Sequence, residues 1–513
     1  MESGCSYRTD YTSIYCLPVY KYIVIAIIIS ILNTLFCTNY YISFIIVIGE
    51  ITALGYCLLK RKYTEYACLY LIFLTLSLEH SFLVGSDAFY GFKNFRIAGV
   101  NIAFVCFIPM IIRALIDKHW LCAVRKKAQN ELDKFLRLIL LMSAAGLVMG
   151  IINIIINDNN IQGINNILWV FLERVYTYIG MVTLPIMVFY FVLKNDKGAV
   201  NKLKETLYGI LIAIVIGQFA SLLFGKTGHH GDSTTLLVTT AAFYIPFLII
   251  FLFYKNYYYR KITFIAGFFG ALISVYFNPS GKALIVVVLL PVLLFLLLLK
   301  RKNKRGLLIY CGAVTIFLLI GGVFLFKLME TNSLFSYKLY QVESMVSFWK
   351  KGWWENMASS PKWRIVEFID ILIEYAKKPW MFIFGKGFMG SILDHTGYFM
   401  QRGASRSAFS LIQWENGTFF SVHETLNVFF LINGLTGLAM IFYIIKTNLK
   451  HMEKTPYIII GSVWFLLFVG YSLTLAYFGI ACLLVGFYDI DCHIRRNTKK
   501  EKMMRDESSS LGF

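Results

Sequence analysis

A histidine followed directly by a glutamate ends a polar stretch of the chain, in the run Ser421-Val-His423-Glu424. Histidine changes charge near neutral pH, so a histidine beside a carboxylate can take a proton from a hydroxyl group as a general base. A pair of this kind is, taken alone, more often the polar start of a helix. His423 and Glu424 are therefore candidate catalytic residues whose role depends on their surroundings.

Charged residues also lie inside a long apolar run, where Arg174 follows Glu173. Ionisable residues at membrane depth usually face a bundle interior or a wet cavity. A guanidinium can hold a phosphate through two parallel hydrogen bonds, which makes Arg174 a candidate anion-binding residue. Structural pairing of the two residues is an equally good interpretation. Glu50 and the pair Glu79-His80 are weaker cases of the same kind.

Two more cations stand at positions where they could meet an anion. Lys282 ends the turn Asn278-Pro-Ser-Gly-Lys282, which opens an apolar run, and its long side chain could simply reach the membrane surface. Arg364 lies in an amphipathic stretch, where a surface salt bridge to Glu367 or Asp370 would be the ordinary alternative.

Other motifs carry less weight. The spacing Gly385-Lys-Gly387-Phe-Met-Gly390 fits GxGxxG but has no βαβ unit around it, so we expect a turn rather than a dinucleotide site. His229-His230 makes only half of a metal site. The ten cysteines show no CxxC or Cys/His metal spacing. We therefore expect no disulfide, no structural zinc, no catalytic metal and no cofactor.

The elements that must position these residues are membrane spans. The chain is 58% hydrophobic and only 15% charged, which excludes a disordered chain and an ordinary soluble enzyme. A helix needs about 20 mostly apolar residues to cross a bilayer. We expect an all-α polytopic membrane protein with about 14 (12–14) spans. They lie near 22–38, 41–59, 66–84, 98–116, 136–156, 167–193, 206–224, 235–254, 262–277, 283–299, 307–326 and 425–445, with two more in 457–489.

The distribution of lysine and arginine orients the spans. With the N-terminus inside and every span alternating, nearly all of the net charge of +20 falls on segments assigned to the cytoplasm. The charge is thus a topology signal, and a nucleic-acid partner loses its support. Both termini are expected in the cytoplasm.

One connection is far longer than the others. We divide the chain into a bundle of about 11 spans (1–326), a large outer loop (327–424), the C-terminal spans (425–489) and a basic cytoplasmic tail (490–513). Within the loop, Trp363 to Tyr375 is amphipathic at helical spacing and Pro379 ends it. Phe348, Trp353 and Trp354 suit a second helix at the membrane interface.

The order of these motifs resembles the O-antigen ligase and Wzy-type polymerase superfamily, whose members are bacterial membrane glycosyltransferases of GT-C type. The resemblance covers roughly 262–446. Its segments are Ser280-Gly-Lys282, Trp363-Arg364 through Pro379, Phe384-Gly-Lys-Gly387, and His423-Glu-Thr-Leu-Asn-Val-Phe-Phe-Leu-Ile-Asn-Gly434-Leu-Thr-Gly437-Leu. The chain departs from the family pattern in having Gly281 before Lys282 instead of adjacent Ser-Arg, and in having Glu424 after the histidine.

The resemblance implies a polymerase for O-antigen or capsule at the outer face of the bacterial cytoplasmic membrane. The donor would be a glycan on undecaprenyl diphosphate, and a chain-length regulator and a flippase would be partners. His423, possibly with Glu424, would act on the acceptor hydroxyl. The residues expected to hold the diphosphate are Arg174, Arg364 and Lys282, with Arg402 and Arg406 as further candidates.

Two alternatives stay open. The acceptor would be lipid A core if the protein is an O-antigen ligase, because the two activities share these segments. A lipid-linked oligosaccharide flippase, or another secondary transporter, would also have about twelve to fourteen spans, and Glu173 with Arg174 would suit a transport cavity. A flippase should show repeat-like halves and no long outer loop.

Overall fold

The computed structural model is built almost entirely of helices. It describes residues 20–78, 90–97, 100–125, 130–156, 161–225, 227–230, 233–236, 260–277, 333–401, 409, 411–469 and 473–510, with single residues and short pieces between 292 and 331. These residues form two compact units. The first comprises Met1–Ile102 with Gly198–Asn278, and the second comprises Ala103–Lys197 with Pro279–Phe513.

Six of the described helices are long and apolar enough to cross a membrane. They are Tyr40–Leu59, Glu131–Ile155, Ile164–Asn195, Ala199–Leu223, Thr425–His451 and Ala476–Arg495. Shorter apolar helices cover Lys21–Phe36, Tyr63–Leu76, Ile102–Ile116, Lys261–Ser274 and Pro456–Leu467, each inside or overlapping a predicted span. The protein is therefore an all-α membrane protein. The predicted spans 235–254, 283–299 and 307–326 fall mostly or wholly outside the described residues, and the total of fourteen stays a prediction.

The first unit packs helices closely through small residues. A side chain at Gly209 would come within 2.9 Å of the Ile23 backbone, and Ser30 Oγ donates a hydrogen bond of 2.7 Å to the Ala213 carbonyl. Such contacts let two apolar helices approach in a membrane. The elements of this unit are α1 (Lys21–Phe36), α2 (Tyr40–Leu59), α3 (Tyr63–Leu76), α9 (Ala199–Leu223) and α11 (Arg260–Phe277), with the hairpins β1 (Arg96–Ile97) with β2 (Val100–Asn101) and β3 (Thr227–His230) with β4 (Ser233–Leu236).

The second unit contains the longer bundle. Its helices are α4 (Ile102–Ile116), α5 (His119–Arg125), α6 (Glu131–Ile155), α7 (Ile164–Val175), α8 (Leu184–Asn195), α20 (Thr425–His451), α21 (Pro456–Phe468) and α22 (Leu473–Ser510). A π-helix, η2 (Tyr176–Thr183), connects α7 to α8 within one long span. At one end of α6, Asp491 of α22 accepts hydrogen bonds from the amides of Glu131 and Leu132, and so satisfies donors that a helix start leaves unpaired.

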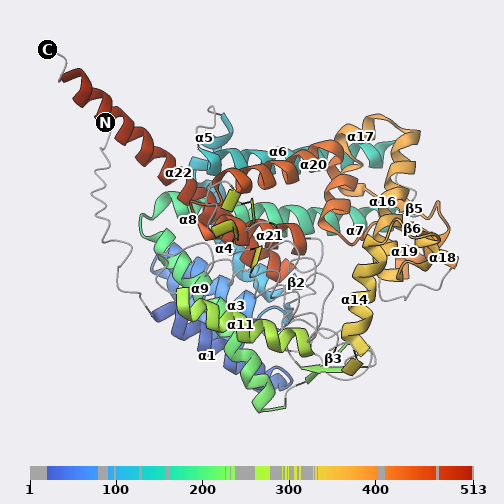
Figure 1. The fold of residues 1–513 in the computed structure, drawn as a ribbon, viewed down its shortest axis with the longest axis horizontal. Coiled ribbons are helices and arrows are strands. Elements are labelled where there is room, and N and C mark those ends of the chain that lie inside the picture. The colour runs from blue at the N-terminus through green and yellow to red at the C-terminus, as the bar shows by residue number, and fades with distance from the viewer. Residues whose placement is uncertain are drawn as a thin grey trace. The chain divides into compact units, whose positions relative to one another are not determined.

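The long loop of the sequence is itself helical and belongs to the second unit. It contains α14 (Ser333–Val346), α15 (Trp353–Asn356), α16 (Ser359–Lys377), α17 (Trp380–Phe384), η4 (Gly387–Met389), α18 (Tyr398–Gln401) and α19 (Leu411–Asn416), with the strand pair β5 (Ile392–Leu393) and β6 (Thr418–Phe419). In Figure 1, α16 and α17 lie at one end of α6 and α20. The predicted amphipathic helix is confirmed as α16, whereas Trp353 and Trp354 start only the four-residue α15.

The loop is joined to the bundle where α20 breaks. Gly434 has φ +58° and ψ −142° inside α20, and a Cβ there would lie 2.5 Å from the Phe382 carbonyl. Next to this break the Lys386 amide donates a hydrogen bond of 2.8 Å to the Leu431 carbonyl. The ring of Phe388 fits over Gly146 of α6, where a Cβ would be only 3.0 Å away. Glycine is thus required where loop and spans meet.

Candidate functional site

One face of α16 carries the polar side chains of the candidate site. Arg364, Glu367, Asp370 and Glu374 follow one another at intervals of three or four residues, so they share a side of the helix. Glu367 and Asp370 are completely buried and Glu374 is 7% exposed. Since an isolated buried carboxylate is costly, each of these groups needs a partner or a proton.

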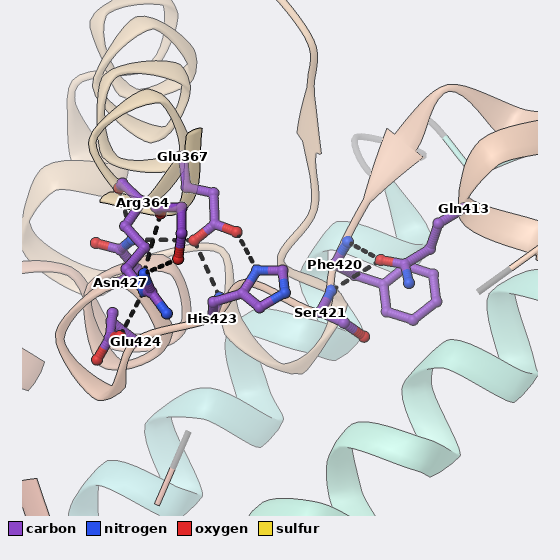
Figure 2. A network of polar contacts seen from close by, with 9 residues as sticks. Arg364, Glu367, Gln413, Phe420, Ser421, His423, Glu424 and Asn427 are labelled. Atoms are coloured by element: carbon purple, nitrogen blue, oxygen red, sulfur yellow. Dashed lines mark hydrogen bonds and ion pairs between the residues drawn. The ribbon is translucent and has the colours of Figure 1, made fainter. Parts of the chain in front are cut away.

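The buried carboxylate of Glu367 holds His423. Oε1 of Glu367 lies 2.5 Å from Nδ1 of His423, and Oε2 accepts a hydrogen bond of 3.0 Å from the His423 amide. Asn427 of α20 donates one hydrogen bond to Glu367 Oε2 and another to the Arg364 carbonyl (Figure 2). A carboxylate on Nδ1 fixes the imidazole tautomer and leaves Nε2 able to accept a proton.

Arg364 lies beside this histidine but pairs with Glu424. Arg364 Nε is 2.6 Å from a Glu424 carboxylate oxygen, and Nη1 donates to the Ser360 carbonyl and hydroxyl. Its side chain stays 34% exposed. The structure therefore brings together Arg364, His423 and Glu424. The salt bridge of Arg364 is to Glu424 and not to Glu367 or Asp370, because Glu367 pairs with His423 and neither Asp370 oxygen has a hydrogen bond of ordinary geometry among the described residues.

A further cation stands near Arg364 on the neighbouring helix α14. Burial lowers the pKa of Lys338, and the positive charge of Arg364 lowers it further, against an opposite effect from Tyr337. A site where one cation lowers the pKa of a neighbouring lysine has a positive potential that favours an anion.

The chain segment before His423 is held in place by Gln413 and by aromatic rings. Gln413, which is 1% exposed, accepts hydrogen bonds from the amides of Phe420 and Ser421 (Figure 2). The imidazole of His423 lies 5.4 Å from the ring of Phe409 and 6.2 Å from that of Trp363, measured between centroids. These rings restrict the orientation of the imidazole.

Arg174 reaches the same segment from α7. Its guanidinium carbon is 5.8 Å from the centre of the Phe420 ring, and the residue is only 8% exposed. Nε and Nη2 of Arg174 are buried without a hydrogen-bond partner among the described residues, and so are one carboxylate oxygen of Glu173 and the hydroxyl of Tyr178. The π-helix begins directly after this pair, and such segments are frequent at functional sites.

The glycine motif forms a turn around a second buried ion pair. Gly385 and Gly387 have φ +73° and +64°, and the chain around them contains no βαβ unit. Between them Lys386, 2% exposed, places its ammonium 3.1 Å from Glu374 and 2.8 Å from the Ser391 carbonyl. The prediction of a turn at this motif is confirmed.

His395 completes this second cluster. His395 Nε2 is 2.7 Å from Glu374 Oε1 and 3.3 Å from the ammonium of Lys377. Burial raises the pKa of the Glu374 carboxyl, but the charge of Lys386 and the hydrogen bonds from His395 and Lys386 outweigh it, and the pKa lies below its usual value. Glu374 is therefore ionised at neutral pH.

Asp370 lies between the two clusters on α16. Burial raises the pKa of Asp370 to about 7, the negative charges of Asp394 and Glu374 raise it further, and the nearby amides of Thr396 and His395 act against them. Neither carboxylate oxygen has a hydrogen bond of ordinary geometry among the described residues. Asp370 is thus half protonated near neutral pH.

This shift predicts how stability depends on pH. The folded state binds the proton of Asp370 more tightly than the unfolded chain does, so its contribution favours folding at low pH and is lost as the pH rises from about 4 to about 7. We expect the Asp370→Asn variant not to show this fall in stability between about pH 4 and about pH 7. At pH 8 it should be at least as stable as the parent. Thermal unfolding in detergent across this range measures it. The exposed variant Glu355→Gln should follow the parent, and an unchanged pH profile of Asp370→Asn would contradict the assignment.

Three predicted residues lie outside the described part of the chain. They are Lys282, Arg402 and Arg406. Asn278 and the pair Glu79-His80 also lie outside the described residues. Sequence reasoning missed Glu367, Asn427 and Gln413 as supports of His423. Of these three residues, only Glu367 could have been identified from the sequence. It follows Arg364 by three residues and so lies on the same face of the predicted helix.

The described residues contain no group of three or more histidine, cysteine, aspartate or glutamate side chains that could hold a metal ion. No family model, curated protein or solved structure matches this chain. The functional argument therefore depends on the geometry around His423.

Proposed function

We propose that this chain is a membrane glycosyltransferase that polymerises lipid-linked oligosaccharide repeats into O-antigen or capsular polysaccharide. The observation that carries the proposal is the dyad of His423 and buried Glu367, with Arg364 on the same helix face as Glu367. The buried guanidinium of Arg174 lies against Phe420, three residues before His423. A base with cations nearby is what transfer from a sugar diphosphate requires. The sequence segments that resemble the ligase and polymerase superfamily contain His423, Arg364 and Lys386.

The reaction follows from the charges at the site. Nε2 of His423 takes the proton of the acceptor hydroxyl, whose oxygen attacks the anomeric carbon of the donor. The bond from that carbon to the diphosphate breaks and its electron pair leaves with the diphosphate. Arg364 and Arg174 stabilise the growing negative charge, and Lys338 adds to the positive potential. Lys282, Arg402 and Arg406 stay proposed contributors.

The proposed setting is the bacterial cytoplasmic membrane, with about 14 spans in a GT-C-type arrangement and both termini in the cytoplasm. The loop with His423 would then face outward, where the donor is an undecaprenyl-diphosphate-linked glycan and the acceptor a new repeat. A chain-length regulator and a flippase would be partners. An O-antigen ligase would use the same groups with lipid A core as acceptor.

The test is complementation of a strain that lacks the native gene. We expect His423→Gln and Arg364→Ala to leave single-repeat product where the parent protein gives a ladder of long glycans on a gel. Lys350→Ala is the control, since this exposed residue forms a salt bridge with exposed Glu343 and is not part of the site. Normal ladders from both site variants at normal protein level would refute the site, and loss of all surface repeats on deletion would point to a flippase.

A further inference from the structure

A single carboxyl group lies near the middle of α2, in the first unit, which contains none of the site residues. Helix α2 is one of the six helices able to cross a membrane, and Glu50 is only 3% exposed. Its buried neighbours on the same helix are spaced by three or four residues, so Glu50 faces the packed side and not lipid. They are Ser43, Val47, Leu54 and Cys57.

No described group compensates a negative charge at this position. Both carboxylate oxygens of Glu50 are buried without a hydrogen-bond partner among the described residues. The charged residues of the helices packed against α2 are Lys21 at the start of α1 and Glu65 in the first turn of α3, whose charged atoms are 3.8 Å apart. The segment 90–97 also packs on α2 and carries Lys93 and Arg96, but its ring contacts are to Tyr40 and Phe44, six or more residues before Glu50. The nearest charge further along the chain, Lys60, follows α2 and is about 15 Å away at 1.5 Å per residue.

The remaining titratable groups on these helices are phenols and thiols. Their ordinary pKa values lie above neutral pH, so they are uncharged there and provide no cation for Glu50. These groups are Tyr22 on α1, Tyr40, Tyr41, Tyr56 and Cys57 on α2 itself, and Tyr63, Tyr66, Cys68 and Tyr70 on α3.

An ionised carboxylate at membrane depth without a cation is energetically costly even on the most permissive insertion scales. A protonated carboxyl group avoids that cost. We propose that Glu50 is a proton-binding site inside the membrane, with its carboxyl group protonated at neutral pH. Carboxyl groups of this kind form the proton relays of pumps and transporters, so the site gives the first unit a proton-dependent element separate from glycan transfer.

A protonated acid in an apolar environment has a diagnostic reaction with a hydrophobic carbodiimide. The acid proton moves to a carbodiimide nitrogen and the carboxylate oxygen bonds to the central carbon, giving an O-acylisourea. Migration of the acyl group from oxygen to nitrogen then gives a stable N-acylurea, and no atom leaves. The product is Glu50 with the mass of one added carbodiimide.

The experiment treats the purified full-length protein in detergent at neutral pH with dicyclohexylcarbodiimide and maps the adduct by peptide mass spectrometry. We expect the adduct on Glu50 and its loss in Glu50→Gln, which keeps the shape of the side chain. Glu65 is the internal control. It is ion-paired and partly exposed, so it should react with a water-soluble carbodiimide and amine and not with the hydrophobic reagent.

Detection is secured by unfolding the same sample in an acidified organic solvent with little water, where every carboxyl group is protonated, hydrolysis of the O-acylisourea is suppressed and the Glu50 peptide carries the adduct. An unmodified Glu50 in the folded protein at neutral pH would then overturn the proposal, because it would mean an ionised and paired side chain. Neither result depends on the glycosyltransferase proposal.

Discussion

Replacing Glu367 by Gln is expected to lower the rate of glycan transfer roughly 10²–10⁴-fold while the protein still folds and inserts, a range typical of lost general base catalysis. The carboxylate accepts a hydrogen bond from Nδ1 of His423 at 2.5 Å and so leaves Nε2 without a proton. An amide at this place can donate to Nδ1, and the ring proton then sits on Nε2. The base is lost although the ring stays in position.

The measurement is the initial rate of glycan extension in membranes that contain the parent's lipid-linked repeat. A positioning role predicts that kcat falls while KM changes little. It also predicts that His423→Gln with Glu367→Gln is no slower than His423→Gln alone, because the two residues act as one unit. Glu367→Asp should recover part of the rate. A Glu367→Gln variant with normal rate and normal pH profile would disprove this role.

The second large effect is expected on stability, from Lys386→Met. Lys386 and Glu374 form a buried ion pair, and Met keeps the length of the lysine stem. Removing one member leaves the other charge buried, which typically costs about 3–5 kcal/mol. His395 lies 2.7 Å from Glu374 and can compensate for part of this loss through its hydrogen bond.

Thermal unfolding of the detergent-solubilised protein at neutral pH tests this. Lys351→Met provides the matched control, since Lys351 is exposed on the surface of the loop and should leave the unfolding temperature unchanged. If Lys386→Met and Lys351→Met have the same unfolding temperature, the ion pair contributes no stability and the turn is held by its backbone contacts alone.

The sequence was sufficient for the elements whose signal is local. The apolar period and Pro379 predicted α16, and continuous apolar runs predicted the spans. The assignment of Arg364 and His423 to one site was inferred from the order of the motifs along the chain and its resemblance to the ligase and polymerase superfamily. The π-helix was not predictable, because the register change after Arg174 depends on packing around Tyr176–Thr183 rather than on residue type.

The partners of the site residues depend on contacts far along the chain. Glu367 and His423 are 56 residues apart, and no local pattern specifies that they meet. Glu424 was expected to assist His423, but its backbone is extended, with φ −108° and ψ 145°. Adjacent side chains of extended backbone point to opposite sides, and in Figure 2 the two leave the chain in different directions. Glu424 therefore reaches Arg364.

On the proposed function, the break at Gly434 would set the distance between the site around His423 and the hydrocarbon of the membrane. Helix α20 runs from Thr425 to His451, about 40 Å at 1.5 Å per residue, which exceeds the hydrocarbon thickness of about 30 Å. The part after the break is about 25 Å long and can nearly cross by itself. The first turns, which carry Asn427 next to His423, can then stand above the hydrocarbon. A lipid-anchored donor would have to extend out of the hydrocarbon to reach the site. The length of the helical segment before Gly434 would determine that distance.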